Sequence, residues 1–404
     1  MHPTTQAVRA LYERFPYPAG PVTLRLGFDV RRALSFVGAS RPAGRPMHVL
    51  DAGCGRGAGL LGMAIAQPDI HFTGVDLNRV ALDEVRATAT ARGLRNVTVA
   101  EVDLESLDGL PVPEGGYDLI VSSGVAHHLV DPRAALERLA SHLAPWGVLD
   151  LMVYARPGRR DIERVAAVIA EEVPAGPVAE RLVAARALVA ARASGPALDL
   201  AFAEAATMGD VEFVDRYLHP QFVSYELDEL RALVEGAGLS FVRWTDPAAV
   251  PVEGSPVDGW AAAAEVIGGS KPRTWDLLTA AHGVPLRPRI GDAQVDAAAF
   301  ALNPEGTLER GVRTMWSGAR ATPVTWKHPS RPGLPLAEGP AALAGEWLQH
   351  IGRPFRGREL VDNLQRHRVP GSDARRLCRL LEHLDVLWRP QEVDVKEHPV
   401  VGRG

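Results

Sequence analysis

Cysteine is scarce in this 404-residue chain, and long apolar runs are missing. The two cysteines, Cys54 and Cys378, are too few for a disulfide framework or for a zinc site built from thiolates. We therefore expect no metal ion and a cytoplasmic protein, because free thiols suit a reducing compartment. No run approaches the ~18 apolar residues that a membrane helix needs. Residues 1–20 also lack the apolar core of a signal peptide, so no membrane association is expected.

Net charge and lysine are low as well. A formal charge of −5 argues against a surface that is generally coated by nucleic acid, and we do not expect a nucleic-acid partner. Only 3 lysines accompany 41 arginines. Residues 310–404 carry 16 Lys and Arg against 10 Asp and Glu, whereas residues 1–309 carry 28 against 39. A basic tail beside an acidic remainder hints at a partner for the tail.

Glycine is instead concentrated in residues 47–59, which have the sequence MHVLDAGCGRGAG. The β-prone residues Val49 and Leu50 come before the glycines, and a proline-free run follows at 60–66. This pattern predicts a strand, a tight glycine loop and a helix. Glycine is needed where the backbone turns at positive φ, or where a ligand lies directly on the main chain. The helix start behind the loop offers unpaired N–H groups to an anionic group.

Two kinds of cofactor use such a loop. The spacing Gly53-x-Gly55-x-x-Ala58 fits the dinucleotide fingerprint, which leaves an NAD-dependent dehydrogenase open. Asp51 favours another ligand, because it lies two residues before Gly53 and can pair with the cationic amino group of a methionyl group. Gly57 extends the pattern to D-x-G-x-G-x-G.

Two further acids follow the next two predicted strands. Asp76 ends the strand 72–76, and its two oxygens match the two hydroxyl donors of a ribose. Asp103 follows the strand 96–102. These motifs, in this order, resemble class I S-adenosylmethionine-dependent methyltransferases. The resemblance implies an α/β fold with a Rossmann-like doubly wound sheet, S-adenosylmethionine as cofactor and S-adenosylhomocysteine as product.

The resemblance also implies which residues contact the cofactor. In the family, the acid at 103 accepts the adenine amino group, and the apolar neighbour at 104 packs on the ring. The predicted cofactor-binding residues are Tyr12, Tyr17, Asp51, Gly53, Cys54, Gly55, Asp76, Leu77, Asp103, Leu104 and Ser123.

Two shorter motifs resemble a bacterial subset of this family. Residues 12–18 have the form Y-x-x-F-P-Y-P, in which two prolines enforce an extended backbone. This segment could form a lid over the cofactor or a hydrophobic clasp for the N-terminus. Residues 124–129 have the form G-V-x-H-H-L and follow the predicted strand 117–121, beside the expected position of the transferring methyl group.

Methyl transfer from a sulfonium requires mainly alignment and exclusion of water, although a nitrogen or oxygen nucleophile can also need a base. His127 and His128 are candidate bases because imidazole titrates near neutrality, and Tyr154 is a third candidate. The alternative is that one histidine packs and the other bonds to backbone. Arg156, Arg159 and Arg160 could hold an acidic substrate, although a solvated rim is their default. The sequence contains no H-E-x-x-H motif that would indicate a metal site.

The chain divides into three predicted parts. Residues 1–44 form an N-terminal cap or lid, and 45–247 form the S-adenosylmethionine-binding domain with a helical insertion at 155–225. Residues 258–404 form an accessory domain, mostly helical and winged-helix-like, with two tightly joined helices at 360–384. This domain could mediate a homodimer. Trp146 departs from the family by replacing a glycine in a turn.

The predicted function is methyl transfer to a nitrogen or oxygen nucleophile. The insertion and the additional domain favour a peptide or protein acceptor, with natural-product biosynthesis as one setting. A small-molecule acceptor is the alternative. A cofactor-binding scaffold or sensor without turnover also remains open, because binding does not establish catalysis. An NAD-dependent dehydrogenase is the weaker enzyme alternative.

Overall fold

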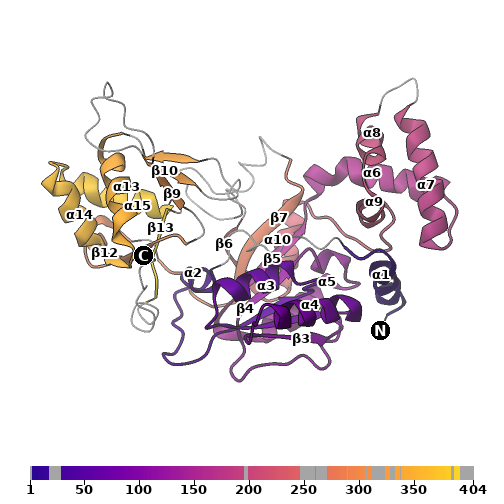
Figure 1. The fold of residues 1–404 in the computed structure, drawn as a ribbon, viewed down its shortest axis with the longest axis horizontal. Helices are drawn as coiled ribbons and strands as arrows, with labels where there is room; N and C mark the ends of the chain where they lie inside the picture. Colours follow the sequence, from indigo (N-terminus) through magenta and orange to yellow (C-terminus); the bar gives the residue numbers. More distant parts are fainter. Residues whose placement is uncertain are drawn as a thin grey trace.

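A computed structural model describes residues 2–17, 29–194, 199–245, 260, 271–288, 290–304, 307–310, 324–327, 333–336, 338–383 and 386–391. Its centre is one seven-stranded sheet (Figure 1). The strand order is β3 (Val97–Glu101), β2 (His71–Asp76), β1 (His48–Ala52), β4 (Tyr117–Ser123), β5 (Leu143–Tyr154), β7 (Thr274–Ala281) and β6 (Leu239–Trp244). The first five strands are parallel, and β7 is antiparallel to both of its neighbours. The predicted doubly wound α/β fold is confirmed.

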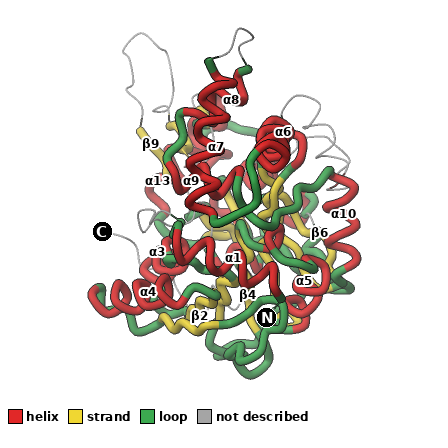
Figure 2. Tube along the Cα trace, turned by 90° about the vertical axis from the view of Figure 1, so that its right-hand side faces the viewer, coloured by secondary structure: helices red, strands yellow, loops and turns green. Residues whose placement is uncertain are grey.

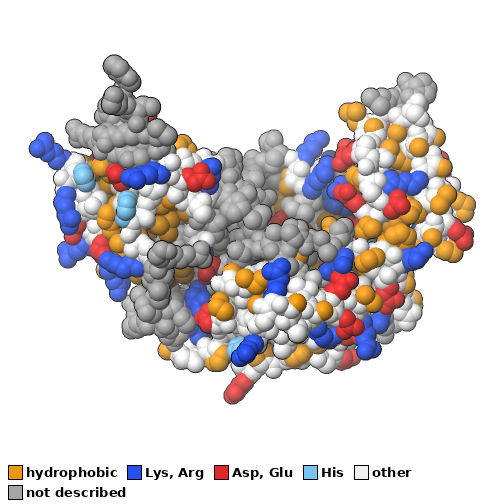
Figure 3. All heavy atoms as spheres, viewed as in Figure 1, with side chains coloured by type: hydrophobic (Ala, Val, Ile, Leu, Met, Phe, Trp, Pro, Cys, Tyr) orange, Lys and Arg blue, Asp and Glu red, His pale blue; other side chains and the backbone are white. Residues whose placement is uncertain are grey.

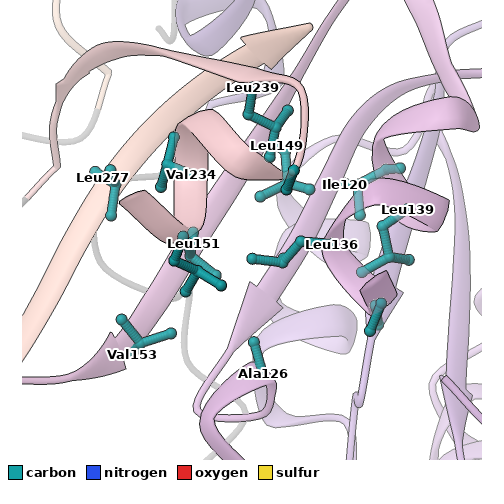
Figure 4. Close-up of a cluster of buried hydrophobic side chains, with 14 of the residues drawn as sticks. Ile120, Ala126, Leu136, Leu139, Leu149, Leu151, Val153, Val234, Leu239 and Leu277 are labelled. Carbon is teal, nitrogen blue, oxygen red and sulfur yellow. The ribbon is translucent and has the colours of Figure 1, made fainter. Parts of the chain in front are cut away.

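Helices cover both faces of this sheet because alternate strand residues are apolar and buried on opposite sides. One face packs against α2 (Val30–Leu34), α3 (Ala58–Ala66) and α4 (Arg79–Ala91). The other face packs against α5 (Pro132–Ser141) and α10 (Leu227–Gly236). Figure 4 shows part of this second core, where side chains of β5 meet those of α5 and α10.

A helical lobe follows β5. It contains α6 (Arg156–Glu172), α7 (Val178–Ala193), α8 (Leu200–Ala206) and α9 (Asp210–Tyr217). A bridge between Ala155 and Tyr225 closes the lobe back onto the end of β5. The N-terminal helix α1 (Pro3–Arg14) buries Leu11 in the core of this lobe. Figure 2 shows α1 close to α9 and α4.

The C-terminal domain has its own core, formed by α13 (Gly339–Ile351), α14 (Gly357–Arg366), α15 (Gly371–His383) and short strands. Its β12 (Phe355–Arg356), β8 (Ala299–Leu302) and β13 (Leu387–Trp388) form one antiparallel sheet, and β11 (Leu334–Leu336), β10 (Val324–Lys327) and β9 (Thr307–Arg310) form another. The short helix α12 (Asp292–Val295) packs on α15. Lys and Arg side chains gather on the outer rim of this domain (Figure 3), as the basic tail predicts.

The structure corrects the predicted boundary at residue 258. Strand β7 belongs to the main sheet and lies between β5 and β6, although its residues fall within the predicted accessory domain 258–404. Its residues Trp275, Leu277 and Leu278 are buried, so β7 completes the core of the sheet. The predicted linker at 247–256 lies outside the described residues.

The C-terminal domain attaches at the edge of the sheet where the parallel strands begin. Val37 bridges to Leu286, and Gln391 donates to the carbonyl of Leu34 at 3.1 Å. Figure 1 shows this domain and the α6–α9 lobe at opposite ends of the molecule, with the sheet between them. Within the described part of the chain, no helix is long and apolar enough to cross a bilayer.

Asp118 holds the start of three strands together. Its fully buried carboxylate accepts from the backbone N–H of His48 at 2.8 Å, from Arg45 at 3.2 Å and from the indole of Trp146 at 2.6 Å. Trp146 therefore lies inside β5 and not in the predicted turn. Its indole supplies a hydrogen bond that glycine cannot make.

Replacing this carboxylate tests its structural role. We expect Asp118→Asn to lower the free energy of unfolding by about 3 kcal/mol, because an amide turns N–H donors toward the donors already present. Urea unfolding measures the change. The control is Asp83→Asn, which alters an exposed pair with Arg86 and should change stability by less than about 0.5 kcal/mol. Equal effects of the two variants would contradict the assigned role.

Candidate active site

The parallel strands bring the predicted site residues to one edge of the sheet. Asp51 lies near the end of β1, Asp76 ends β2, Ser123 ends β4 and Tyr154 ends β5. Asp51 is buried and pairs in register with Gly74 and Val121 on its two sides. Ligands of open α/β sheets bind beyond this edge.

The glycine loop after β1 needs its glycines for different reasons. Gly53, Gly55 and Gly57 all adopt positive φ, which side chains disfavour. A Cβ on Gly53 would lie 2.4 Å from Val125, and one on Gly57 would lie 2.7 Å from Val85. A Cβ on Gly55 would meet nothing within 4 Å. The space over Gly55 is therefore open, as a site for a ligand on the backbone requires.

Asp76 connects this loop to the next helix. One carboxylate oxygen accepts from the N–H of Gly55 at 2.8 Å, and the other accepts from the N–H of Asn78 at 2.8 Å. Burial raises the pKa of Asp76, although these N–H donors oppose the shift. Each oxygen retains a lone pair that can accept a hydrogen bond from a hydroxyl group of a ligand.

The start of α3 lies directly behind the loop. Its N-cap is Gly57, which has no side chain, so no side chain satisfies the first N–H groups of the helix. The N–H groups of Gly53 and Cys54 are already used, because both donate to the carbonyl of Val75. An anionic group can therefore bind at the start of α3 and not at residues 53–54.

The remaining predicted cofactor residues lie around the same edge. Asp103 accepts from the N–H of Glu105 at 3.0 Å and so shapes its own turn, while Leu104 is buried beside it. Cys54 and Leu77 are partly buried. Burial raises the pKa of the Cys54 thiol well above its usual value, which keeps it protonated.

His127 and His128 lie in a short 3-10 helix, Ala126–His128, just after β4. The ring of His127 is completely buried and stacks on Tyr154 with centroids 3.6 Å apart. His128 lies 2.8 Å from the carbonyl of Gln221 through Nδ1. Since a carbonyl only accepts, Nδ1 carries the proton and Nε2 is the acceptor. One histidine thus packs and the other bonds to backbone, the arrangement of the alternative prediction.

The helical lobe adds residues that are not among the predicted site residues. The ring of His219 lies tilted by 35° against that of His128 with centroids 3.9 Å apart, and Phe222 lies edge-on against Tyr154. Asp215 of α9 accepts from the hydroxyl of Tyr12 at 3.1 Å. The only signal for them in the sequence is that they belong to an insertion after β5, which borders the site.

Tyr12 joins the two halves of the site. Its hydroxyl binds Asp215 of the lobe, and its backbone carbonyl accepts from the Asn78 side chain at 3.3 Å, two residues after Asp76. Arg9 of the same helix pairs with Glu101 at the end of β3. Tyr17, in contrast, is 61% exposed. Helix α1 therefore spans from the glycine-loop half to the lobe.

Burial controls the protonation of this cluster. It lowers the pKa of His128 to about 4 and that of His219 to about 2, and it lowers the pKa of His127 well below its usual value. Burial also raises the pKa of Tyr154 to about 12, with a contribution from Asp215. At neutral pH the histidines are neutral and Tyr154 is protonated. Tyr154 can therefore donate a hydrogen bond more readily than accept a proton.

The three arginines after β5 differ sharply. Arg156 pairs with Glu229 and Arg160 pairs with Glu226, as expected of a solvated rim. Arg159 is only 6% exposed and stacks its guanidinium 3.4 Å from the ring centroid of Tyr154. The default expectation for Arg159 is therefore wrong.

Comparison with known proteins identifies a domain within this fold. A family model described as a methyltransferase domain matches residues 50–149. An uncharacterised protein of Synechococcus sp. is 32% identical over 256 residues, which is 60% of each chain. An uncharacterised methyltransferase of Mycobacterium bovis is 32% identical over 117 residues, which is 28% of this chain and 53% of the relative.

Among solved structures, PKMT2 from Rickettsia typhi in complex with AdoHcy shares the fold. The TM-score is 0.65 at 16% identity, with 93% of this chain and 77% of that chain covered. The predicted doubly wound class I fold is confirmed. The methyltransferase domain matched at residues 50–149 supports the predicted enzyme class and S-adenosylmethionine as its cofactor. The chain spans 60% or less of the length of these curated relatives. Membership of the bacterial subset with the two short motifs stays a prediction.

Gly55 offers a direct test of where the cofactor lies. We expect Gly55→Ala to weaken S-adenosylhomocysteine binding by about tenfold or more, because the methyl group would occupy the open space over the loop. Isothermal calorimetry measures the affinity. The matched control is Gly93→Ala, since Gly93 also has positive φ and open space but lies at the end of α4. Both variants should lose about 1 kcal/mol of stability. Unchanged affinity in Gly55→Ala would contradict this placement.

The buried histidines predict how stability depends on pH. The pKa of His128 lies at about 4 in the folded chain against 6.5 as its ordinary value, so the unfolded chain binds more protons between these pH values. Stability should therefore fall as the pH falls from about 6.5 to about 4, by about 3 kcal/mol for this group.

Thermal unfolding between pH 7.5 and pH 4.5, both chosen values, tests this expectation. His128→Gln removes the titrating ring yet can still donate to Gln221, so its midpoint should fall less on acidification than that of the parent chain. His350→Gln, at an exposed position, is the control and should behave like the parent. Parallel acid sensitivity in all three proteins would refute the assignment to His128.

Proposed function

We propose that this protein transfers the methyl group of S-adenosylmethionine to a nitrogen or oxygen nucleophile of an acceptor that binds under the α6–α9 lobe. The observation that carries the proposal is the convergence at one sheet edge of an open glycine loop, the Asp76 carboxylate and a buried aromatic cluster. The match of residues 50–149 to a methyltransferase domain supports the same reaction.

The cofactor would occupy the half of the site over β1 and β2. Asp76 would accept the ribose hydroxyls, Asp51 would pair with the methionyl amino group, and the Gly55 backbone would contact the ligand. Asp103 and Leu104 would hold the adenine, because they follow β3 on the same edge. Cys54, Leu77 and Ser123 would complete the contacts. The strand order then places the transferable methyl group near β4.

The acceptor would approach from β4 and β5, where His127, His128 and Tyr154 lie. Displacement at a sulfonium carbon needs a nucleophile held in line and a site without bulk water. The buried rings of His127 and His128, with the partly buried ring of Tyr154 beside them, would limit the access of water there. Nε2 of His128 is the nitrogen free to accept a proton, although its low pKa makes it a weak base.

We further propose a peptide or protein as the acceptor. The likeness in fold over 93% of the chain to PKMT2 from Rickettsia typhi, and the size of the lobe, support this choice. A small-molecule acceptor is the second candidate, because Aklanonic acid methyltransferase of Streptomyces sp. is 39% identical over 99 residues. The predicted homodimer through residues 258–404 stays a prediction.

Calorimetry and a transfer assay test the function together. S-adenosylmethionine, S-adenosylhomocysteine and NAD are titrated in parallel into the full chain and into Asp76→Ala. We expect the sulfur ligands alone to bind, and we expect Asp76→Ala to weaken them by about tenfold or more, because a charged hydrogen-bond acceptor is lost. Methyl-labelled cofactor is then incubated with peptide and small-molecule fractions of a bacterial extract.

The outcomes distinguish the candidate acceptors and functions. Label in the peptide fraction supports the proposed acceptor, and label confined to small molecules supports the second candidate. Binding of the sulfur ligands without label in either fraction favours a scaffold or sensor. Binding of NAD alone would refute the methyltransferase proposal.

A further inference from the structure

Arg159 combines deep burial with an unsatisfied charge. It is 6% exposed, and its Nε and Nη2 atoms are buried with no hydrogen-bond partner in the described part of the chain. A buried cation without a hydrogen-bonded anion is costly, so such groups are normally paired or contact a ligand. Arginine donates in a rigid planar fork that matches a carboxylate.

The two carboxylates that influence the pKa of Arg159 both accept hydrogen bonds from other side chains. Asp215 and Glu163 both influence its pKa, yet Asp215 accepts from the Tyr12 hydroxyl and Glu163 accepts from the Ser224 hydroxyl. Among the described residues, neither forms an ion pair with Arg159 within 4.0 Å. The guanidinium instead lies on the ring of Tyr154 and near that of Phe222.

Other unpaired donors lie in the same cluster. Nδ1 of His219 accepts from the N–H of Gln221 at 3.1 Å, so the proton of the neutral ring is on Nε2. That Nε2 atom is buried without a partner, as are both ring nitrogens of His127. The cluster therefore offers more donors than acceptors, a balance that an anionic, acceptor-rich ligand would correct.

The position of Arg159 points to the acceptor and not to the cofactor. Tyr154 ends β5, and Arg159 lies in the first turns of α6 directly after it. The glycine loop follows β1, with β4 between these two strands. The cofactor half and Arg159 are thus separated by the strand after which the methyl group should lie.

We infer that Arg159 binds a carboxylate carried by the methyl acceptor. The inference rests on the proposed function and narrows its substrate class to anionic acceptors. A cationic amine is disfavoured, because it would place a second positive charge beside an unpaired guanidinium. A peptide can supply the carboxylate through an acidic side chain or its C-terminus, and a small molecule through an acid group.

Three probes that share a phenyl ring and differ in charge test the inference. Benzoate, benzamide and benzylamine are titrated by calorimetry into the full chain saturated with S-adenosylhomocysteine. We expect benzoate to bind with a saturable heat, and benzamide and benzylamine to bind at least about tenfold more weakly, because only benzoate pairs with the guanidinium. Absence of saturable benzoate binding would overturn the inference.

Variants locate the binding to one side chain. Arg159→Met keeps the aliphatic stem and should weaken benzoate by about tenfold or more, while Arg159→Lys should retain part of the affinity. Arg160→Met is the matched control, because Arg160 is the exposed neighbour paired with Glu226, and it should bind benzoate like the parent. Equal benzoate binding by the parent and Arg159→Met would overturn the inference.

A cofactor arm separates the two possible sources of a carboxylate. If Arg159 held the methionyl carboxylate, Arg159→Met would weaken S-adenosylhomocysteine and leave methylthioadenosine, which lacks that carboxylate, unaffected; this result would overturn the inference. We expect both nucleosides to bind the variant like the parent. Failure of S-adenosylhomocysteine to bind the parent chain would instead refute the proposed function.

Thermal unfolding gives a readout that does not depend on a ligand. We expect Arg159→Met to raise the unfolding midpoint, because it removes a buried charge with unsatisfied donors. A lower midpoint would indicate that Arg159 serves the packing of Tyr154 and would count against a ligand role.

Discussion

Two hydrogen bonds to one carboxylate fix the geometry on which the site depends. Asp76 accepts from Gly55 in the loop after β1 and from Asn78 at the start of α4, so one side chain sets the positions of two segments. Gly55 can then keep its positive φ beside open space, because the Asp76 carboxylate holds the loop through the N–H of Gly55. Asp76 therefore connects the end of β2, the loop after β1 and the start of α4.

The second half of the site depends on how the chain leaves β5. The bridge between Ala155 and Tyr225 returns the lobe to the strand from which it departed, so residues near 219–222 come beside those near 127 and 154. Three chain segments thus form one buried cluster, and Tyr12 adds a fourth from α1. The C-terminal domain, at the opposite edge of the sheet, takes no part in this cluster through any described contact.

The sequence predicted those features that local pattern determines. The order of Asp51, the glycines, Asp76 and Asp103 indicated the loop and the strand ends because each lies next to its strand in the chain. It could not predict that β7 inserts between β5 and β6, since that pairing joins residues far apart. The burial of Arg159 could not be predicted from the sequence either, because an arginine near a strand end is solvated unless another part of the chain covers it. Trp146 was misplaced in a turn because its partner, Asp118, lies on another strand.

Electrostatics connects the two halves of the proposed site. S-adenosylmethionine carries a positive sulfonium, and the aromatic cluster holds neutral histidines, a protonated Tyr154 and the cation of Arg159. Asp215 lies in the same cluster, but it accepts from the Tyr12 hydroxyl and, in the part of the chain that the structure describes, forms no ion pair with Arg159 within 4.0 Å. A sulfonium bound beside β4 and the guanidinium of Arg159 would repel each other, and an anion between them would offset that repulsion. An acceptor carboxylate would relieve this repulsion while its nucleophile faces the sulfonium. After transfer the cofactor product is a neutral thioether, so the attraction that brings substrates together weakens once the methyl group has moved.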